Sequence, residues 1–259
     1  MAFMTSDSHD PTDRQVQILR LWKQVAQDNS SAHHFHFERE YTPEESRSRA
    51  KEFITTPSEQ TFKTLWDPMW SAQRSGTANT IYKKWHDHGQ TDKELASLIK
   101  EILHADHYDA SWQGELGARR TLWELFGFLH IEEYPIINGY AERGLSFFGY
   151  DCPSDYEGCA NVFSEFRTAY ESVVGHATAG TEHEVPVNFE IDQLLNVIDK
   201  VSAGDLDREA NADARQLYEM VLEESGDHGV SEPEEYDGIN AATEDVLSKL
   251  GRTALLNSC

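Results

Sequence analysis

Residues 154–173 have the sequence SDYEGCANVFSEFRTAYESV and give the clearest secondary-structure signal in the chain. Ser154, followed three residues later by Glu157, has the spacing of a helix-capping box. After it, large apolar residues recur at intervals of three and four over five turns, as on one face of an α-helix. These residues are Tyr156, Cys159, Phe163, Phe166, Tyr170 and Val173. The stretch therefore predicts a long amphipathic helix whose apolar face packs into a core.

The same two signals, a start pattern and a 3.6-residue period, recur along the chain. Residues 42–45 and 56–59 each combine a capping residue with proline and glutamate, as at helix starts. Consecutive alternating strands joined by hairpin turns are absent from the sequence. We therefore predict an all-α, multi-helix globular domain with a glycine-containing helix-turn-helix or hairpin element and an acidic C-terminal helical extension. Further helices are expected at 13–28, from 91, and at 189–201, 208–222 and 238–250.

Two stretches of loop composition suggest how the chain is divided. Residues 175–184 are small and polar, and residues 226–237 combine acidic residues with glycine and proline. We expect an N-terminal helical region at 1–56, a helical core module at 57–201 and an acidic extension at 202–259.

The 259 residues include 22 Lys+Arg and 46 Asp+Glu, a formal net charge of −24. Such a charge opposes binding to nucleic acids and anionic membranes, because both are polyanions. The excess is uneven: residues 1–143 hold 16 basic and 22 acidic residues, and residues 144–259 hold 6 and 24. We favour adaptation to a high-salt cytoplasm, where screening weakens the repulsion of partners. The alternative is an acidic interaction tail or a nucleic-acid mimic.

The sequence argues against a membrane or secreted protein, a disulfide framework and a metal site. We expect a cytoplasmic, soluble protein without a membrane partner, because no long apolar run and no secretion signal occur. Cys152, Cys159 and Cys259 lack CxxC spacing and are expected to be reduced thiols. Histidines cluster at 33–36, 86–88 and 104–107 without a known ligand pattern. We therefore expect no metal, no cofactor and no catalytic residues.

Residues 112–130, WQGELGARRTLWELFGFLH, contain the most informative pattern for function. A turn bounded by Gly114 and Gly117 lets backbone N–H groups approach an anion, and the start of the following helix adds partial positive charge. Arg119 and Arg120 would lie in its first turn, where cations are unfavourable for the helix dipole. Their position suggests contact with phosphates. The alternative is close helix packing, with both arginines paired to neighbouring acids.

A second basic stretch, QRSGTANTIYKKW at 73–85, carries Arg74, Lys83 and Lys84. Its mixture of cationic, hydroxyl, amide and aromatic groups suits backbone contacts and base stacking. A solvated helix face is the alternative. Tyr134 and Asn138 are candidates for a base pocket, although a Tyr-Pro sequence between helices is often structural.

Residues 129–150, LHIEEYPIINGYAERGLSFFGY, extend the pattern with Tyr-Pro-Ile-x-Asn and Leu-x-x-Phe-Gly-Tyr. Together with WDPMW at 66–70 and DQLLNVID at 192–199, this resembles the N-terminal helical modules of McrB-type restriction proteins and their uncharacterised haloarchaeal relatives. The resemblance covers roughly residues 60–201 and is one of pattern more than of identity. It implies a DNA-recognition or adaptor module of a defence system, usually fused to an AAA+ motor.

The sequence departs from that family because it contains no Walker motif. We therefore expect a recognition subunit acting with a separate AAA+ ATPase or nuclease, or else a truncated or divergent relative. The turn at 114–120 is also similar to the hairpin of base-excision glycosylases. Asn138 stands where such an enzyme would more typically have Asp, and an amide cannot act as a base.

The favoured hypothesis is a non-catalytic DNA-recognition or adaptor module of a restriction-like system. Its expected phosphate contacts are Arg74, Lys83, Lys84, Gly114, Gly117, Arg119 and Arg120. The alternatives are an acidic protein–protein adaptor that docks a basic partner, and a DNA glycosylase-like enzyme.

Overall fold

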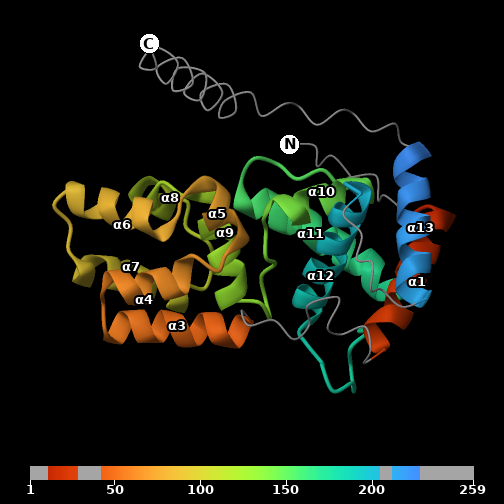
Figure 1. Ribbon diagram of the computed structural model, residues 1–259, viewed down its shortest axis with the longest axis horizontal. Coiled ribbons are helices and arrows are strands. Elements are labelled where there is room, and N and C mark those ends of the chain that lie inside the picture. Colours follow the sequence, from red (N-terminus) through yellow and green to blue (C-terminus); the bar gives the residue numbers. More distant parts are fainter. Residues whose placement is uncertain (1–10, 29–41, 205–211, 228–259) are drawn as a thin grey trace, which may run out of the picture. The chain divides into compact units, whose positions relative to one another are not determined.

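Residues 11–28, 42–204 and 212–227, which the computed structural model describes, form twelve helices and no strand (Figure 1). The all-α class predicted from the sequence is confirmed. The first six helices are α1 (Asp13–Gln27), α3 (Pro43–Thr55), α4 (Glu59–Trp66), α5 (Trp70–Ser75), α6 (Ala78–Asp87) and α7 (Asp92–His104). The others are α8 (Ser111–Leu116), α9 (Arg119–Leu129), α10 (Gly139–Phe147), α11 (Tyr156–Val173), α12 (Val187–Ser202) and α13 (Ala212–Asp227).

Contacts divide the chain into two units, Met1–Leu222 and Glu223–Cys259. Of the second unit, only 223–227 is described, as the end of α13. The helix predicted at 238–250 lies outside the described residues. None of the helices in the described ranges has both the length and the apolar composition of a membrane-crossing segment.

The capping residues explain where most helices begin. Thr42 and Thr91 accept a hydrogen bond from the backbone N–H three residues further on, as their sequence patterns predict. At two other predicted starts the cap is a neighbouring residue: Ser58 caps α4, and Asp155 instead of Ser154 caps α11. The helices predicted at 13–28 and 189–201 correspond to α1 and α12, and those predicted from 42, 56, 91 and 154 correspond to α3, α4, α7 and α11. The helix predicted at 208–222 is described at Ala212–Asp227, so it ends five residues later than predicted.

Helix α12 is deeply buried, with all of residues 188–196 shielded from solvent. It packs closely on α10, because a Cβ added to Gly144 would lie 2.7 Å from the Leu195 Cβ. Helix α1 joins α11 through the Trp22 indole, whose Nε1 donates to the Tyr170 hydroxyl at 2.9 Å. The largest fully buried side chains are Trp22, Trp66, Trp112, Trp123, Tyr170, Phe53, Phe62, Phe126, Phe148, Phe163 and Phe166.

Helices of the predicted N-terminal region, 1–56, pack directly on those of the predicted core module, 57–201. Helix α3 contacts α4, α7 and α9, and α1 contacts α11. The Arg47 Nε adds a hydrogen bond to the Leu129 carbonyl at the end of α9. Both predicted segments therefore contribute to the unit Met1–Leu222.

The expectation of reduced thiols is wrong for two of the three cysteines. Cys152 and Cys159 form a disulfide across a sequence separation of 7, with their Cα atoms 4.7 Å apart. The absence of CxxC spacing did not exclude this bond, because the turn before α11 brings the first turn of that helix back beside Cys152. Cys259 lies outside the described residues.

We expect reduction of this disulfide, or the pair Cys152→Ser and Cys159→Ser, to lower the free energy of unfolding by about 2 kcal/mol, because a short loop is released in the unfolded chain. Urea denaturation with and without reductant measures the effect. The double serine variant is the control, since its stability should not respond to reductant. Equal stability of the wild-type protein in both conditions would contradict the prediction.

Candidate functional site

The turn between α8 and α9 contains the glycine pattern singled out in the sequence. Gly117 ends α8 with a φ of 67°, in the left-handed region that glycine adopts without strain. Its N–H donates to the Gln113 carbonyl at 2.8 Å, which closes the helix. Gly114 lies within α8, before the turn, and a Cβ added there would meet nothing within 4 Å. Gly117 therefore makes the turn, and its amide is already used to form it.

The basic stretch of α6 meets this turn. A Cβ added to Gly117 would lie 2.7 Å from the Lys84 Nζ, so the ammonium group lies against the turn. Gly76, just before α6, is close to the same turn, because its added Cβ would lie 3.9 Å from the Ala118 Cβ. Lys83 and Lys84 are both exposed. Two basic segments that are far apart in the sequence are thus brought together; Figure 1 shows α5, α6, α8 and α9 in this region.

Helix α9 begins without a side-chain cap. Its N-cap residue is Ala118, which has no acceptor atom, whereas α3, α4, α7 and α11 begin at residues that accept from a backbone N–H. The first turn of α9 contains no acidic residue and starts with Arg119 and Arg120. Because a helix start carries partial positive charge, positive potential is concentrated here.

The two arginines make different contacts, although both lie near the Trp123 ring. Their Cζ atoms are 5.1 and 5.3 Å from the ring centroid, within the range of cation–π attraction. Arg119 is exposed, and its Nη1 donates to the Ser154 carbonyl at 3.1 Å, within the loop closed by the disulfide. Arg120 is ion-paired with Glu142 of α10. The alternative interpretation, pairing with a neighbouring acid, therefore describes Arg120.

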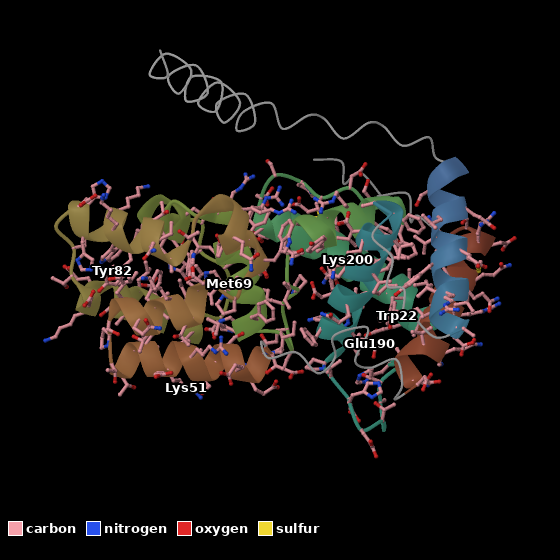
Figure 2. The ribbon with its side chains drawn as sticks, in the orientation of Figure 1. Trp22, Lys51, Met69, Tyr82, Glu190 and Lys200 are labelled. Carbon is pink, nitrogen blue, oxygen red and sulfur yellow. A yellow bond between two sulfur atoms is a disulfide. The ribbon has the colours of Figure 1, made fainter. Side chains whose placement is uncertain are left out.

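The aromatic residues of the second basic stretch are used inside the fold. Trp85 is only 3% exposed, and its Nε1 donates to the Thr91 carbonyl at 2.9 Å. The Tyr82 hydroxyl donates to Asp92 at 2.5 Å, and burial together with this hydrogen bond raises the pKa of Tyr82. Figure 2 labels Tyr82 on α6. These rings belong to the apolar face of α6, a role that the sequence pattern did not reveal. The exposed side of the helix carries Lys83 and Lys84 together with Asn79, Thr80, His86 and Asp87.

Tyr134 and Asn138, the candidates for a base pocket, both make structural contacts. The Asn138 Oδ1 accepts hydrogen bonds from the N–H groups of Tyr140 and Ala141, both at 3.0 Å, and so caps α10. The Tyr134 hydroxyl donates to the Asp106 carbonyl at 2.6 Å. A role in base binding stays a prediction for both residues.

An aromatic cluster supports α9 from within. Phe126 makes edge contacts with Tyr108, Tyr134 and Tyr156, at centroid distances of 5.5, 4.9 and 5.5 Å. Burial raises the pKa of Tyr108 to about 12. The Tyr156 hydroxyl donates to the Pro135 carbonyl at 2.9 Å. Phe126 and Tyr156 are buried in the core, and Tyr108 and Tyr134 pack against it, so the cluster helps to fix the position of α9.

Comparisons with protein families, curated proteins and solved structures were made for the whole chain. None of them gives a match. In the three described ranges, no group of three His, Cys, Asp or Glu side chains is arranged to hold a metal ion. The histidines at 33–36 lie outside those ranges.

A surface cluster of aromatic and cationic side chains was not found by the sequence reasoning, apart from Arg74. We call it the Trp70–Tyr140 cluster, and it consists of Trp70, Arg74, Tyr140, Arg143 and Lys200. The two rings lie 4.3 Å apart, and the Arg74 Cζ lies 4.5 Å from the Trp70 ring centroid. The available signal was spacing: Arg74 follows Trp70 by four residues and Arg143 follows Tyr140 by three, which are neighbouring positions on a helix.

Proposed function

We propose that the chain is a non-catalytic nucleic-acid-binding module whose phosphate-binding surface is formed by the α8–α9 turn and the facing side of α6. The position of Lys84 against Gly117, at the uncapped start of α9, is the observation that carries the proposal. Phosphate groups bind at helix starts through backbone N–H groups and dipole charge, and through nearby cations. Arg119 extends the same surface.

The charges of this surface support a polyanionic ligand. Lys83, Lys84 and Arg119 are exposed, and none of them forms an ion pair with an acid in the described residues. Negative charge elsewhere on the protein repels a polyanionic ligand and lowers its affinity. A local contact with the cations stays possible at high salt, where long-range repulsion is screened.

In its finer form, the proposal is a DNA-recognition subunit of a restriction-like defence system from a high-salt cytoplasm, acting with a separate AAA+ ATPase or nuclease. The resemblance of residues 60–201 to McrB-type modules supports this form. A gene for such an ATPase or nuclease beside that of the protein would strengthen it. Co-purification of a stable protein partner without any nucleic-acid binding would favour the acidic adaptor instead.

Charge reversal tests the proposed surface. We expect the pair Lys84→Glu and Arg119→Glu to weaken binding to short duplex and single-stranded DNA by about tenfold or more. The slope of log affinity against log salt should become shallower by about 2, one for each lost phosphate contact. Gel shift or fluorescence anisotropy across a KCl series, extended to about 1–2 M, measures both quantities.

The matched control is the pair Lys51→Glu and Lys100→Glu, which changes the net charge equally at exposed positions on α3 and α7. Figure 2 labels Lys51. We expect the control to bind as the wild-type protein does, within about twofold. An equal loss in both pairs would assign the effect to net charge. Failure of the wild-type protein to bind any duplex or single strand, modified or unmodified, would overturn the proposal.

A further inference from the structure

The Trp70–Tyr140 cluster places two partly exposed aromatic rings in contact at the surface. Trp70 begins α5 and Tyr140 lies in the first turn of α10, and their ring planes are inclined by 44°. Gly139 permits this approach, because a Cβ added there would lie 3.0 Å from two atoms of the Trp70 ring. Trp and Tyr rings that are only partly buried are enriched at binding interfaces. A pair held partly exposed is therefore a candidate for contact with a ligand.

Three cations from three helices surround this pair. The Arg74 Cζ of α5 lies 4.5 Å from the Trp70 centroid. The Arg143 Cζ of α10 and the Lys200 Nζ of α12 lie 5.6 and 5.9 Å from the Tyr140 centroid. These distances allow cation–π attraction, which holds a guanidinium or ammonium group over a ring. Figure 2 labels Lys200 and also Met69, the residue before Trp70.

Hydrogen bonds to two carboxylates hold parts of the cluster in place. Glu124, only 3% exposed, accepts hydrogen bonds from the N–H groups of Trp70 and Ser71 at 2.9 and 2.8 Å. The Asp199 carboxylate accepts two hydrogen bonds from the Arg143 guanidinium, at 2.6 and 2.9 Å. The backbone of Trp70 and the side chain of Arg143 are therefore held in place before a ligand binds.

These groups match the chemistry of single-stranded nucleic acid. A guanidinium plane that lies on an aromatic ring has a second face on which a flat base can stack, and Arg74 is exposed. Arg143 and Lys200 are cations of the kind that contact flanking phosphates. A duplex hides the faces of its bases in its own stack, so an unpaired base fits this arrangement better.

We propose that the Trp70–Tyr140 cluster binds an unpaired nucleobase of a single strand, with the base stacked on the Arg74 guanidinium and its phosphates beside Arg143 and Lys200. The inference rests on the proposed function and extends it, because it names the strand state of the ligand and adds a second contact surface. It gives Arg74 a stacking role in addition to its charge.

The test compares a thymidine oligonucleotide with a strand of equal length that carries abasic sugar–phosphate units. Both have the same phosphates, but only the first has bases. We expect the full chain to bind the thymidine strand about fivefold more tightly, in line with the lower range for base stacking. Arg74→Lys keeps the charge and removes the planar group, so this preference should disappear.

Arg20→Lys, at an exposed position on α1, is the matched control and should keep the preference. Equal binding of both strands by the wild-type protein, or an undiminished preference in Arg74→Lys, would overturn the inference while duplex binding would still support the proposed function. Absence of any nucleic-acid binding by the wild-type protein would overturn both this inference and the proposed function. If poly-glutamate displaced the thymidine strand and the abasic strand equally well, the cluster would be a site for acidic groups. That result would point to an acidic protein partner and would overturn the inference.

Discussion

Glu190→Ala is expected to lower the free energy of unfolding by about 4 kcal/mol, because it leaves several buried donors without their acceptor. Glu190 is fully buried on α12 and accepts hydrogen bonds from the Ala177 N–H at 3.0 Å and from the Thr178 N–H and Oγ1, both at 2.8 Å. The Tyr170 hydroxyl also donates to it, and that hydroxyl accepts from Trp22. Figure 2 labels Trp22 and Glu190.

This network joins α1, α11, α12 and the loop after α11, so its loss affects most of the surrounding core. Urea denaturation followed by circular dichroism measures the change. Glu184→Ala is the matched control: Glu184 is exposed and accepts one hydrogen bond, from the Gly180 N–H at 2.7 Å. We expect that variant to lose about 1 kcal/mol or less. Similar losses for the two variants would show that the buried network contributes little.

The second large effect is expected at Gly127, where Gly127→Ala should lower the free energy of unfolding by about 3 kcal/mol through overpacking. A Cβ at this position of α9 would lie 2.3 Å from the Pro135 carbonyl oxygen and 2.6 Å from the Ile136 Cα. Both are backbone atoms. The segment cannot retreat easily, because the Pro135 oxygen accepts from the buried Tyr156 hydroxyl at 2.9 Å.

Gly114→Ala provides the control for this substitution. Gly114 also lies within a helix, but an added Cβ would have open space around it. Alanine there should leave stability unchanged or raise it by about 0.5–1 kcal/mol, because alanine favours the helix. Thermal denaturation distinguishes the two variants, and a wild-type transition for Gly127→Ala would contradict the close packing described. Gly114→Ala also tests the expected phosphate contact of Gly114, which predicts weaker DNA binding.

Part of the candidate site was predictable from the chain alone. Arg74, Lys83, Lys84 and Arg119 are exposed cations, as their sequence positions suggested. Trp85 was not predictable as a buried ring, because the interleaving of aromatic and cationic residues is the same for a stacking surface and for an amphipathic helix. The pairing of Arg120 on α9 with Glu142 on α10 required the tertiary structure, which brings the two side chains together.

Local signals in the sequence were sufficient to predict that the chain is helical and where its longer helices begin. Capping residues such as Thr42 and Thr91, and an apolar period such as that of α11, act over one or two turns and need no distant partner. The folded structure alone placed Lys84 against Gly117, joined Cys152 to Cys159 and surrounded Glu190 with donors. The disulfide depends on how the turn before α11 folds back on the helix. The other two contacts join segments that lie apart in the sequence, so they depend on how helices pack, and burial of many side chains together sets that packing, which no local pattern encodes.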